Sequence, residues 1–151
     1  MPLKFWNDKN DFKYKKAYFS KYSNIWHHGD YAEMKKKGGF IIYGRSDTTL
    51  NPGGVRLGTA EIYSEVDKFI EIKESIVVGQ AWDNDIRIIL FIVLNKGFKL
   101  NEKLLQKIKI QIRKNASPRH VPAKVIVVND IPRTKNGKIV ELAVKNIIEG
   151  N

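Results

Sequence analysis

The amino-acid sequence predicts an α+β fold in which helices pack on a small mixed sheet, preceded by a short helix and a hairpin. Two β-branched, apolar runs at 75–80 and 86–94 are separated by a polar turn, which is typical of paired strands. The next stretch, 101–114, has apolar residues at helical spacing. With 151 residues, the chain suits one domain, or one domain with an appendage.

The elements expected after residue 58 are, in order, a helix at 59–69, strands at 75–80 and 86–94, a helix at 101–114, a strand at 123–128 and a helix at 140–148. Thr59 and Asn101 are the expected N-caps of the first two helices, because their side chains can accept hydrogen bonds from free backbone amides. Apolar side chains at helical spacing give each of these helices one buried face. They are Ile62, Val66 and Phe69 in the first helix, and Leu104, Leu105, Ile108 and Ile112 in the second.

The first 44 residues have a different pattern. A short helix is expected at 8–22, followed by strands at 28–34 and 39–43 that a glycine-containing loop joins into a hairpin. We expect a boundary at 45–47, so that residues 1–44 belong to one unit and residues 45–151 to another.

Composition excludes several classes of protein. The 42% hydrophobic and 28% charged content is that of a soluble globular chain that can bury a core. No run of about eighteen apolar residues could cross a membrane, and the first residues lack the apolar core of a secretory signal. The absence of cysteine excludes disulfides and thiolate zinc sites, and makes a cytoplasmic location the default expectation.

The net charge is +11, and the surplus of cations lies at the two ends of the chain. Lys and Arg outnumber Asp and Glu by ten to five in 1–50 and by eleven to four in 101–151, whereas 51–100 has six against seven. The surplus suits a polyanionic partner, either nucleic acid or a phosphate-rich cofactor. A lysine-rich, solvated surface would give the same count. Nucleic acid is disfavoured, because aromatic residues do not alternate with the cations at 133–138 as stacking modules require.

The stretch 44–61, GRSDTTLNPGGVRLGTAE, combines four glycines and a proline with charges of both signs. Such a density of glycine and proline indicates a bend or swivel, not the interior of an element. Backbone amides at Gly53 and Gly54, beside the guanidinium of Arg56, would form a seat for a phosphate. The alternative is an ordinary surface loop.

GRSD followed by NPGGVRLGTAEIY resembles the hinge region of adenylate-forming acyl-CoA synthetases. Further segments resemble the same family in the same order: FWND at 5–8, WHHGDYAE at 26–33, SPRHVPAK at 117–124 and IPRTKNGKIVELAV at 131–144. The resemblance covers nearly the whole chain and is greatest to family members that act on acetoacetate.

The resemblance implies an acid–thiol ligase of lipid metabolism that works in two steps. ATP, accompanied by Mg²⁺, and acetoacetate would give acetoacetyl-adenylate and pyrophosphate. CoA would then displace AMP to give acetoacetyl-CoA. Another short-chain acid, such as acetate or propionate, is the alternative substrate.

The second informative stretch is IPRTKNGK at 131–138, where three cations surround an Asn-Gly pair. Asn-Gly is a strong turn signal, so Lys138 is expected on a loop. A lysine on a mobile loop can neutralise phosphate charge as it develops, although a basic hairpin tip has the same pattern. The resemblance implies that Lys138 is the catalytic lysine, which promotes attack of the carboxylate on the α-phosphate of ATP. Asn136 replaces the Ser or Thr more usual in the family.

Three site residues near the boundary follow from the resemblance alone. Asp30 would hold the ribose hydroxyls of the nucleotide, although a turn aspartate beside Gly29 is the alternative. Arg45 would contact the same nucleotide. Asp47 would be the hinge residue about which the C-terminal domain turns between the two steps.

Three further positions match family residues that lie near the phosphate or CoA. Gly54 would lie against the pantetheine tunnel, where any side chain would obstruct. Arg56 would lie near the adenylate phosphate. Arg113 would bind the CoA nucleotide, but the helix macrodipole also favours a cation at that place without any ligand.

No metal site and no catalytic triad is expected. The histidines are His27, His28 and His120, and no cysteine accompanies them. His27 and His28 would point apart on a strand, which disfavours shared metal ligation. Ser117 and His120 have no third partner that spacing identifies.

The family's phosphate-binding loop and acyl pocket are not in this sequence. Residues 1–44 would be the tail of a large N-terminal adenylation domain, and residues 45–151 the mobile C-terminal domain. We therefore expect the chain alone to be inactive. Two alternatives remain: a subunit that docks onto a separately encoded N-terminal domain through residues 1–44, or a folded remnant without activity.

Overall fold

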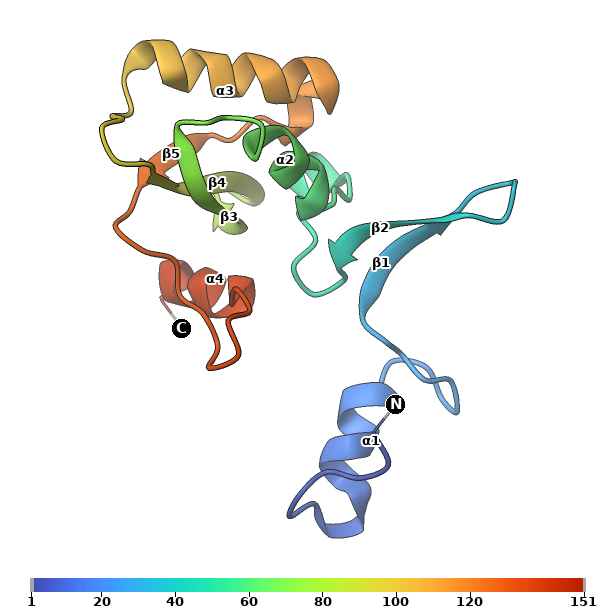
Figure 1. The fold of residues 1–151 in the computed structure, drawn as a ribbon. Coiled ribbons are helices and arrows are strands. Elements are labelled where there is room, and N and C mark those ends of the chain that lie inside the picture. Colours follow the sequence, from blue (N-terminus) through green and yellow to red (C-terminus); the bar gives the residue numbers. More distant parts are fainter. Residues whose placement is uncertain (1, 151) are drawn as a thin grey trace.

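The computed structural model describes residues 2–150, and Figure 1 shows the arrangement of their helices and strands. In chain order these are α1 (Phe12–Tyr18), β1 (Asp30–Met34), β2 (Phe40–Arg45), α2 (Thr59–Val66), β3 (Ile72–Trp82), β4 (Asp85–Leu94), α3 (Glu102–Asn115), β5 (Lys124–Val127) and α4 (Glu141–Glu149). Short 3-10 turns lie at Lys9–Asp11, Pro52–Gly54 and Pro118–His120. The expected α+β fold, with a short helix and a hairpin before it, is confirmed.

The larger sheet is mixed, as expected, with the strand order β3-β4-β5. β3 and β4 are antiparallel, and the residues between them, Asp83 and Asn84, both have the positive φ that a two-residue hairpin turn requires. β5 pairs with β4 in parallel. This is possible because α3, which connects the two strands, returns the chain to the end of the sheet at which β4 begins. The smaller sheet is the antiparallel hairpin β1-β2.

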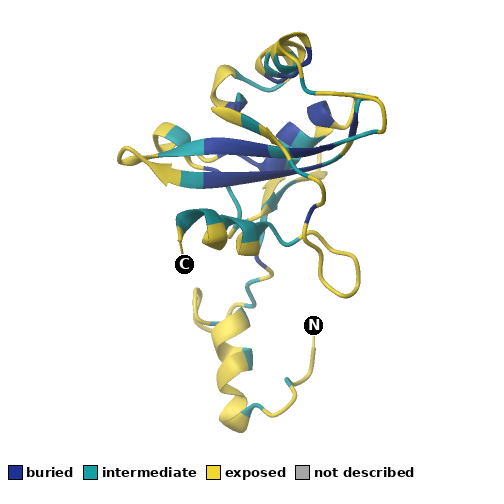
Figure 2. Cartoon of the chain, turned by 90° about the vertical axis from the view of Figure 1, so that its left-hand side faces the viewer, coloured by how far each residue is buried: buried dark blue, intermediate teal, exposed yellow. Residues whose placement is uncertain are grey.

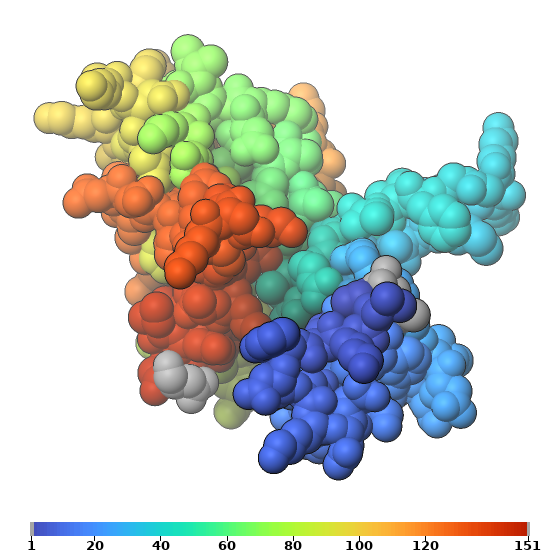
Figure 3. Space-filling view, turned by 60° about the horizontal axis from the view of Figure 1, so that its bottom comes forward, coloured from blue at the N-terminus to red at the C-terminus, as the bar shows by residue number. Residues whose placement is uncertain are grey.

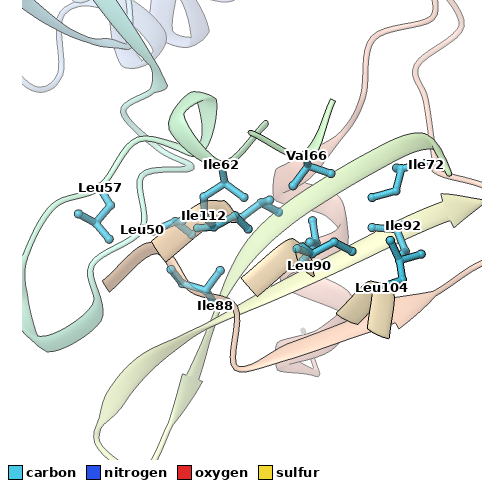
Figure 4. Close-up of a cluster of buried hydrophobic side chains, with 12 residues drawn as sticks. Leu50, Leu57, Ile62, Val66, Ile72, Ile88, Leu90, Ile92, Leu104 and Ile112 are labelled. Carbon is cyan, nitrogen blue, oxygen red and sulfur yellow. The ribbon is translucent and has the colours of Figure 1, made fainter. Parts of the chain in front are cut away.

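The sheet β3-β4-β5 has a buried core on each face. Between the sheet and the helices α2 and α3 lie twelve buried side chains, and Figure 4 shows those of the helices pointing toward the strands. They are Leu50, Leu57, Ile62, Val66, Ile72, Val77, Ile88, Leu90, Ile92, Leu104, Ile108 and Ile112. On the other face, α4 packs on a smaller cluster. These two cores make one three-layer unit, here called the C-terminal unit (residues 46–150).

Residues 2–45 bury very little. Gly29 is the only buried residue in this range, and Figure 2 shows α1 and its neighbours as exposed, in contrast to the buried sheet. The rings of Phe5, Tyr14 and Tyr18 contact one another edge to face, with centroids 5.4 to 5.7 Å apart. Other large apolar side chains of this range are exposed: Leu3, Trp6, Phe12, Tyr22, Ile25, Met34, Phe40, Ile41 and Ile42.

The helix α1 is shorter than the one expected at 8–22. It begins at Phe12 because Asn10 and Asp11 have φ values of 57° and 56°, outside the helical region. The carboxylate of Asp8 accepts hydrogen bonds of 2.8 Å from two backbone amides of the first turn. The strand expected at 28–34 likewise begins only at residue 30, so both neighbouring histidines precede it.

The N-cap of α2 is Gly58 and not the expected Thr59, which is the first helical residue and is buried. The carboxylate of Glu61 accepts a hydrogen bond of 3.3 Å from the amide of Gly58. A Cβ at this position would overlap the carbonyl oxygen of Tyr43 in β2. No side-chain cap fits at residue 58, because the chain enters the helix directly against the hairpin.

Within residues 2–150, no helix is both long and apolar enough to cross a bilayer.

Candidate active-site residues

Asp30, Arg45 and Asp47 lie together where the hairpin meets the C-terminal unit. Asp30 and Arg45 face each other in the β1-β2 register. One guanidinium nitrogen of Arg45, Nη1, donates to the carbonyl of His28 at 3.0 Å and lies 3.6 Å from Oδ1 of Asp30. The other, Nη2, donates to Oδ2 of Asp47 at 3.3 Å. The hairpin register brings Asp30 to Arg45, and the contact of Arg45 with Asp47 adds a third residue that the resemblance singled out to this charged cluster.

Two residues of the cluster, Arg45 and Asp47, line a hollow of about 540 Å³ that residues of α1 also line. The imidazole of His28 contacts the second carboxylate oxygen of Asp30, and the ring of Trp26 lies 5.0 Å from that of His28. The Nε1 of Trp26 is buried without a hydrogen-bond partner among the described residues. Carboxylates beside a guanidinium and an aromatic wall can bind hydroxyl groups and a flat ring.

Gly54 lies at the end of the 3-10 turn Pro52–Gly54, with φ of 75°. The carboxylate of Asp85 accepts hydrogen bonds of 2.8 and 3.0 Å from the amide of Gly53, which ties the turn to the β3-β4 hairpin. The amides of Ile86 and Gly53 lower the pKa of Asp85. Apart from Gly54 itself and its two neighbours in the chain, no heavy atom of residues 2–150 lies within 4 Å of a Cβ built on Gly54. The space beside Gly54 is therefore open to a ligand.

Arg56 lines a second hollow, of about 370 Å³, between the hairpin and the C-terminal unit. Its guanidinium lies 5.6 Å from the ring centroid of Tyr31 in β1. Glu61 and His120 line the same hollow from the other side. Arg56 is thus near the junction but belongs to a different hollow from the one beside Arg45.

His120 has a partner that spacing did not reveal. It is 4% exposed, its Nδ1 lies 2.8 Å from the hydroxyl of Ser117, and its Nε2 lies 3.2 Å from Oε2 of Glu61. The hydroxyl of Ser117 also accepts a hydrogen bond from the amide of Arg119, so Ser117 is the N-cap of the 3-10 turn Pro118–His120. Ser117, His120 and Glu61 therefore tie the turn after α3 to the start of α2. Glu61 and His120 are 59 positions apart in the sequence, and no local pattern indicates their contact.

Lys138 closes a tight loop that follows β5. The amide of Thr134 donates to the carbonyl of Lys138 at 2.8 Å, and the amide of Gly137 donates to the carbonyl of Thr134 at 2.9 Å. Gly137 has φ of 82°, so the three-residue loop ends in the left-handed conformation that glycine favours. The loop lies at the surface next to α4, as Figure 3 shows in orange. These hydrogen bonds join Thr134 to Gly137 and Lys138, and the Asn-Gly pair lies in the turn, as its sequence predicts.

Lys138 and Arg113 both project from exposed positions. Among residues 2–150, neither side chain makes an ion pair or hydrogen bond, and neither contacts the cluster of Asp30, Arg45 and Asp47. Arg113 lies in the last turn of α3, as expected. The structure thus brings three of the seven expected site residues together and leaves Gly54, Arg56, Arg113 and Lys138 at separate places.

The chain is similar to known proteins along its whole length. It is 56% identical over 150 residues to an acetoacetyl-coenzyme A synthetase from Rhizobium meliloti (strain 1021), and 49% identical over 151 residues to an acetoacetyl-CoA synthetase from Xenopus tropicalis. Each alignment covers 99% of this chain, but only 23% and 22% of the respective relative.

The fold is similar to that of a solved acetoacetyl-CoA synthetase from Streptomyces lividans, with a TM-score of 0.91 and 43% identity. That match covers 100% of this chain and 22% of the other, so the chain spans less than a quarter of the length of these relatives. Residues 61–138, more than half of the chain, match the family described as AMP-binding enzyme C-terminal domain. The chain therefore belongs to the family of AMP-binding enzyme C-terminal domains.

Proposed function

We propose that this chain is the C-terminal part of an acetoacetate–CoA ligase. The observation that carries the proposal is the 56% identity, over 99% of the chain, to a protein named acetoacetyl-coenzyme A synthetase. In the first step, a carboxylate oxygen of acetoacetate attacks the α-phosphate of ATP and pyrophosphate leaves. In the second, the thiol of CoA attacks the acyl carbon, AMP leaves and the thiol proton is released.

The boundary residues serve the nucleotide in this proposal. Asp30 accepts hydrogen bonds from the ribose hydroxyls, and Arg45 holds the carboxylate in place from 3.6 Å. Asp47 is the point about which residues 48–151 turn between the two steps, and residues 1–44 remain with the N-terminal domain. Support comes from the contact of Arg45 with Asp47. It joins the last residue of β2 to the start of the segment that leads to α2.

Lys138 is the proposed catalytic residue of the first step. Its ammonium would neutralise negative charge that develops on the α-phosphate during attack. The side chain is exposed, and Thr134 and Gly137 fix the backbone beside it, so the loop presents the lysine outward. Support also comes from the separation of this loop from the junction, because a rotation of the C-terminal unit would change which of them faces the nucleotide.

The second step uses other residues in this proposal. The open space beside Gly54 would receive the pantetheine arm of CoA, Arg56 the adenylate phosphate, and Arg113 the nucleotide of CoA. Mg²⁺ would enter with ATP as part of the substrate. Within residues 2–150, no group of three or more His, Asp and Glu side chains is placed to bind it.

A partner for residues 2–45 is part of the proposal. Nine large apolar side chains of this range are exposed, which suits a surface that is covered by more protein. The proposed cover is an N-terminal adenylation domain, either in the same polypeptide or encoded separately. A docking subunit without catalytic residues is the second candidate, and the same exposed side chains favour it.

The test is an assay for AMP release with ATP, acetoacetate and CoA. We expect no activity from the chain alone, and activity after residues 1–151 replace the matching segment of the Streptomyces lividans enzyme. Lys138→Ala in this chimera should lower adenylation by at least about a hundredfold. Lys135→Ala, in the same loop, is the matched control and should change it less than about twofold.

Three outcomes would overturn parts of the proposal. Thioester formation by the chain alone would show that no further domain is needed. Full adenylation by Lys138→Ala would remove the catalytic role of this lysine. Faster turnover with acetate or propionate than with acetoacetate would change the substrate while the reaction class is kept.

A further inference from the structure

We propose that Arg133 and Glu74 form a positioning pair that sets the place of Lys138 for the adenylation step. The inference rests on the proposed function, because it assigns a task to Lys138. Arg133 lies five residues before Lys138, and Glu74 lies in β3, so the pair connects the loop to the sheet of the C-terminal unit.

The guanidinium of Arg133 makes two separate contacts. Nη2 donates to Oε2 of Glu74 at 2.8 Å, and Nη1 donates to the carbonyl oxygen of Gly137 at 2.8 Å. Gly137 is the neighbour of Lys138 in the chain. The side chain of Arg133 therefore contacts both the sheet and the backbone next to the proposed catalytic residue. A planar guanidinium can hold two acceptors at fixed directions, which a lysine ammonium does less well.

A bulge in β3 places Glu74 on the side of the sheet that faces the loop. Ile72 pairs with Leu94 and Glu74 pairs with Val93, so Lys73 is the extra residue. Ile72 therefore points into the core under α2 and α3, while Glu74 points to the opposite face, where Arg133 lies. Bulges re-aim side chains in this way, and they are frequent next to active sites.

The two ends of the loop are anchored independently of Arg133. Ile131, just before the loop, is 2% exposed and packs in the core on the α4 face. After the loop, Glu141 accepts a hydrogen bond from the hydroxyl of Tyr63. The same hydroxyl accepts a hydrogen bond of 3.0 Å from the amide of Val77 in β3. Burial, followed by the charge of Glu141, raises the pKa of Tyr63, so its hydroxyl keeps the proton that it donates.

The anchors at Ile131 and Glu141 do not fix the part of the loop next to Lys138, and the pair of Arg133 and Glu74 does. Ile131 and Glu141 fix where the loop leaves and rejoins the C-terminal unit, but neither touches the residues next to Lys138. Arg133 is the side chain that bonds to Gly137 and to the sheet at once. Loss of this pair would leave the hydrogen bonds between Thr134, Gly137 and Lys138 in place but would free the loop to move relative to the sheet. A small displacement of a reacting group can lower a rate by about a hundredfold.

The first experiment separates the two half-reactions in the chimera with the Streptomyces lividans enzyme. Adenylation is followed by exchange of pyrophosphate into ATP, and thioester formation by supplying preformed acetoacetyl-adenylate with CoA. Arg133→Gln and Glu74→Gln should each lower adenylation about tenfold and leave thioester formation within about twofold. Arg133→Lys should lie between Arg133→Gln and the parent, because an ammonium keeps one contact at a time. Lys135→Gln is the control with the same charge change.

The second experiment uses the chain itself and needs no activity. Backbone order parameters from nuclear magnetic resonance should be about 0.85 at Gly137 and Lys138 in the parent, and below about 0.6 in Arg133→Gln and Glu74→Gln. The amides of Ile76 and Val144, on the same face of the sheet, should not change. This measurement tests whether Arg133 and Glu74 hold the backbone at Gly137 and Lys138, and it does so whether or not the chimera is active.

The results distinguish the two proposals. If Lys138→Ala leaves adenylation intact, the catalytic role proposed for Lys138 fails. If Lys138→Ala abolishes adenylation but both Gln variants match the parent in rate and order parameters, the positioning pair alone is refuted. An equal loss in both half-reactions would mean that Arg133 and Glu74 serve general stability, which also overturns the inference.

Discussion

Residues 2–45 and the C-terminal unit differ in what holds them together. The C-terminal unit has a buried core on each face of its sheet, whereas the first 44 described residues have one buried residue, Gly29. Both regions nevertheless contain regular helices and strands. The comparison teaches that hydrogen-bonded elements and an apolar composition are not sufficient for a folded unit, because stability requires apolar area to be removed from water.

The largest expected effect is the separation of the two regions. A fragment of residues 46–151 should unfold cooperatively near the temperature at which the full chain unfolds, because it keeps both cores. A fragment of residues 1–45 should show no cooperative transition, because a lone hairpin and a short helix are marginal in water. Thermal scans by circular dichroism test both. A sharp transition in the shorter fragment would show that residues 1–45 are stable without a buried core, against the comparison of the two regions.

The second test compares one isoleucine from each region. Ile108 is fully buried between α3 and the sheet, so Ile108→Ala should lower the free energy of unfolding by about 3 kcal/mol. Ile42 in β2 is 59% exposed, so Ile42→Ala should change it by less than about 0.5 kcal/mol. Urea titrations measure both values. Equal losses would mean that the hairpin is buried in solution, for example by self-association.

The third test is aimed at the junction of the regions. Gly58→Ala would place a methyl group against the carbonyl of Tyr43, so α2 and β2 must move apart or strain, at a cost of about 2 kcal/mol. Gly39→Ala is the matched control, because no heavy atom of residues 2–150 beyond its chain neighbours lies within 4 Å of its built Cβ. Urea titration gives the cost, and hydrogen exchange of the Ser46 amide, which donates to Gly29 at 2.8 Å, reports separation of the two regions. Identical behaviour of the two variants would show that the regions are not in contact.

The smallest effect concerns a carboxylate inside the C-terminal unit. Glu65 in α2 accepts hydrogen bonds from Lys68, and from Gln111 and Asn115 on α3. Lys68 first, then the two amides, lower the pKa of Glu65. Glu65→Ala should cost about 1 kcal/mol at neutral pH, since two amide donors lose their acceptor.

The dependence on pH has a definite sign. A lowered carboxyl pKa gives stability that is present above the ordinary value of 4.5 and is lost as the pH falls through the lowered value. The difference in free energy of unfolding between the parent and Glu65→Ala should therefore shrink on acidification below 4.5. A difference that stays constant or grows would contradict the assigned cause.

Much of the C-terminal unit could be predicted from sequence, because its elements obey local rules. Asn101 caps α3 and accepts the amide of Leu104 at 2.9 Å, as its position before an apolar stripe indicates. The β-branched runs became β3 and β4, and the polar turn between them remained a turn. The exception at residue 58 has a tertiary cause, since the hairpin excludes any capping side chain there.

The candidate site was predicted less completely. The register of a hairpin pairs Asp30 with Arg45, and both were found through short motifs. The contacts of His120 with Glu61, and of Arg133 with Glu74, each join residues 59 positions apart. No local pattern encodes such contacts, because they depend on how α2, the sheet and the loops pack. The roles of all seven expected site residues remain predictions that the experiments above address.

The hydroxyl of Tyr63 has a consequence for solubility. β3 is an outer strand of its sheet, and an outer strand with a free amide can recruit a strand from another molecule. At Val77, midway along this edge, the amide is already occupied by the phenol, which Glu141 at the start of α4 holds in turn. The phenol of Tyr63 thus makes one backbone amide of this edge unavailable to a strand from another molecule. Removal of residues 141–151 would take away the partner of the phenol, and we expect light scattering to detect more self-association of the shortened chain than of the parent.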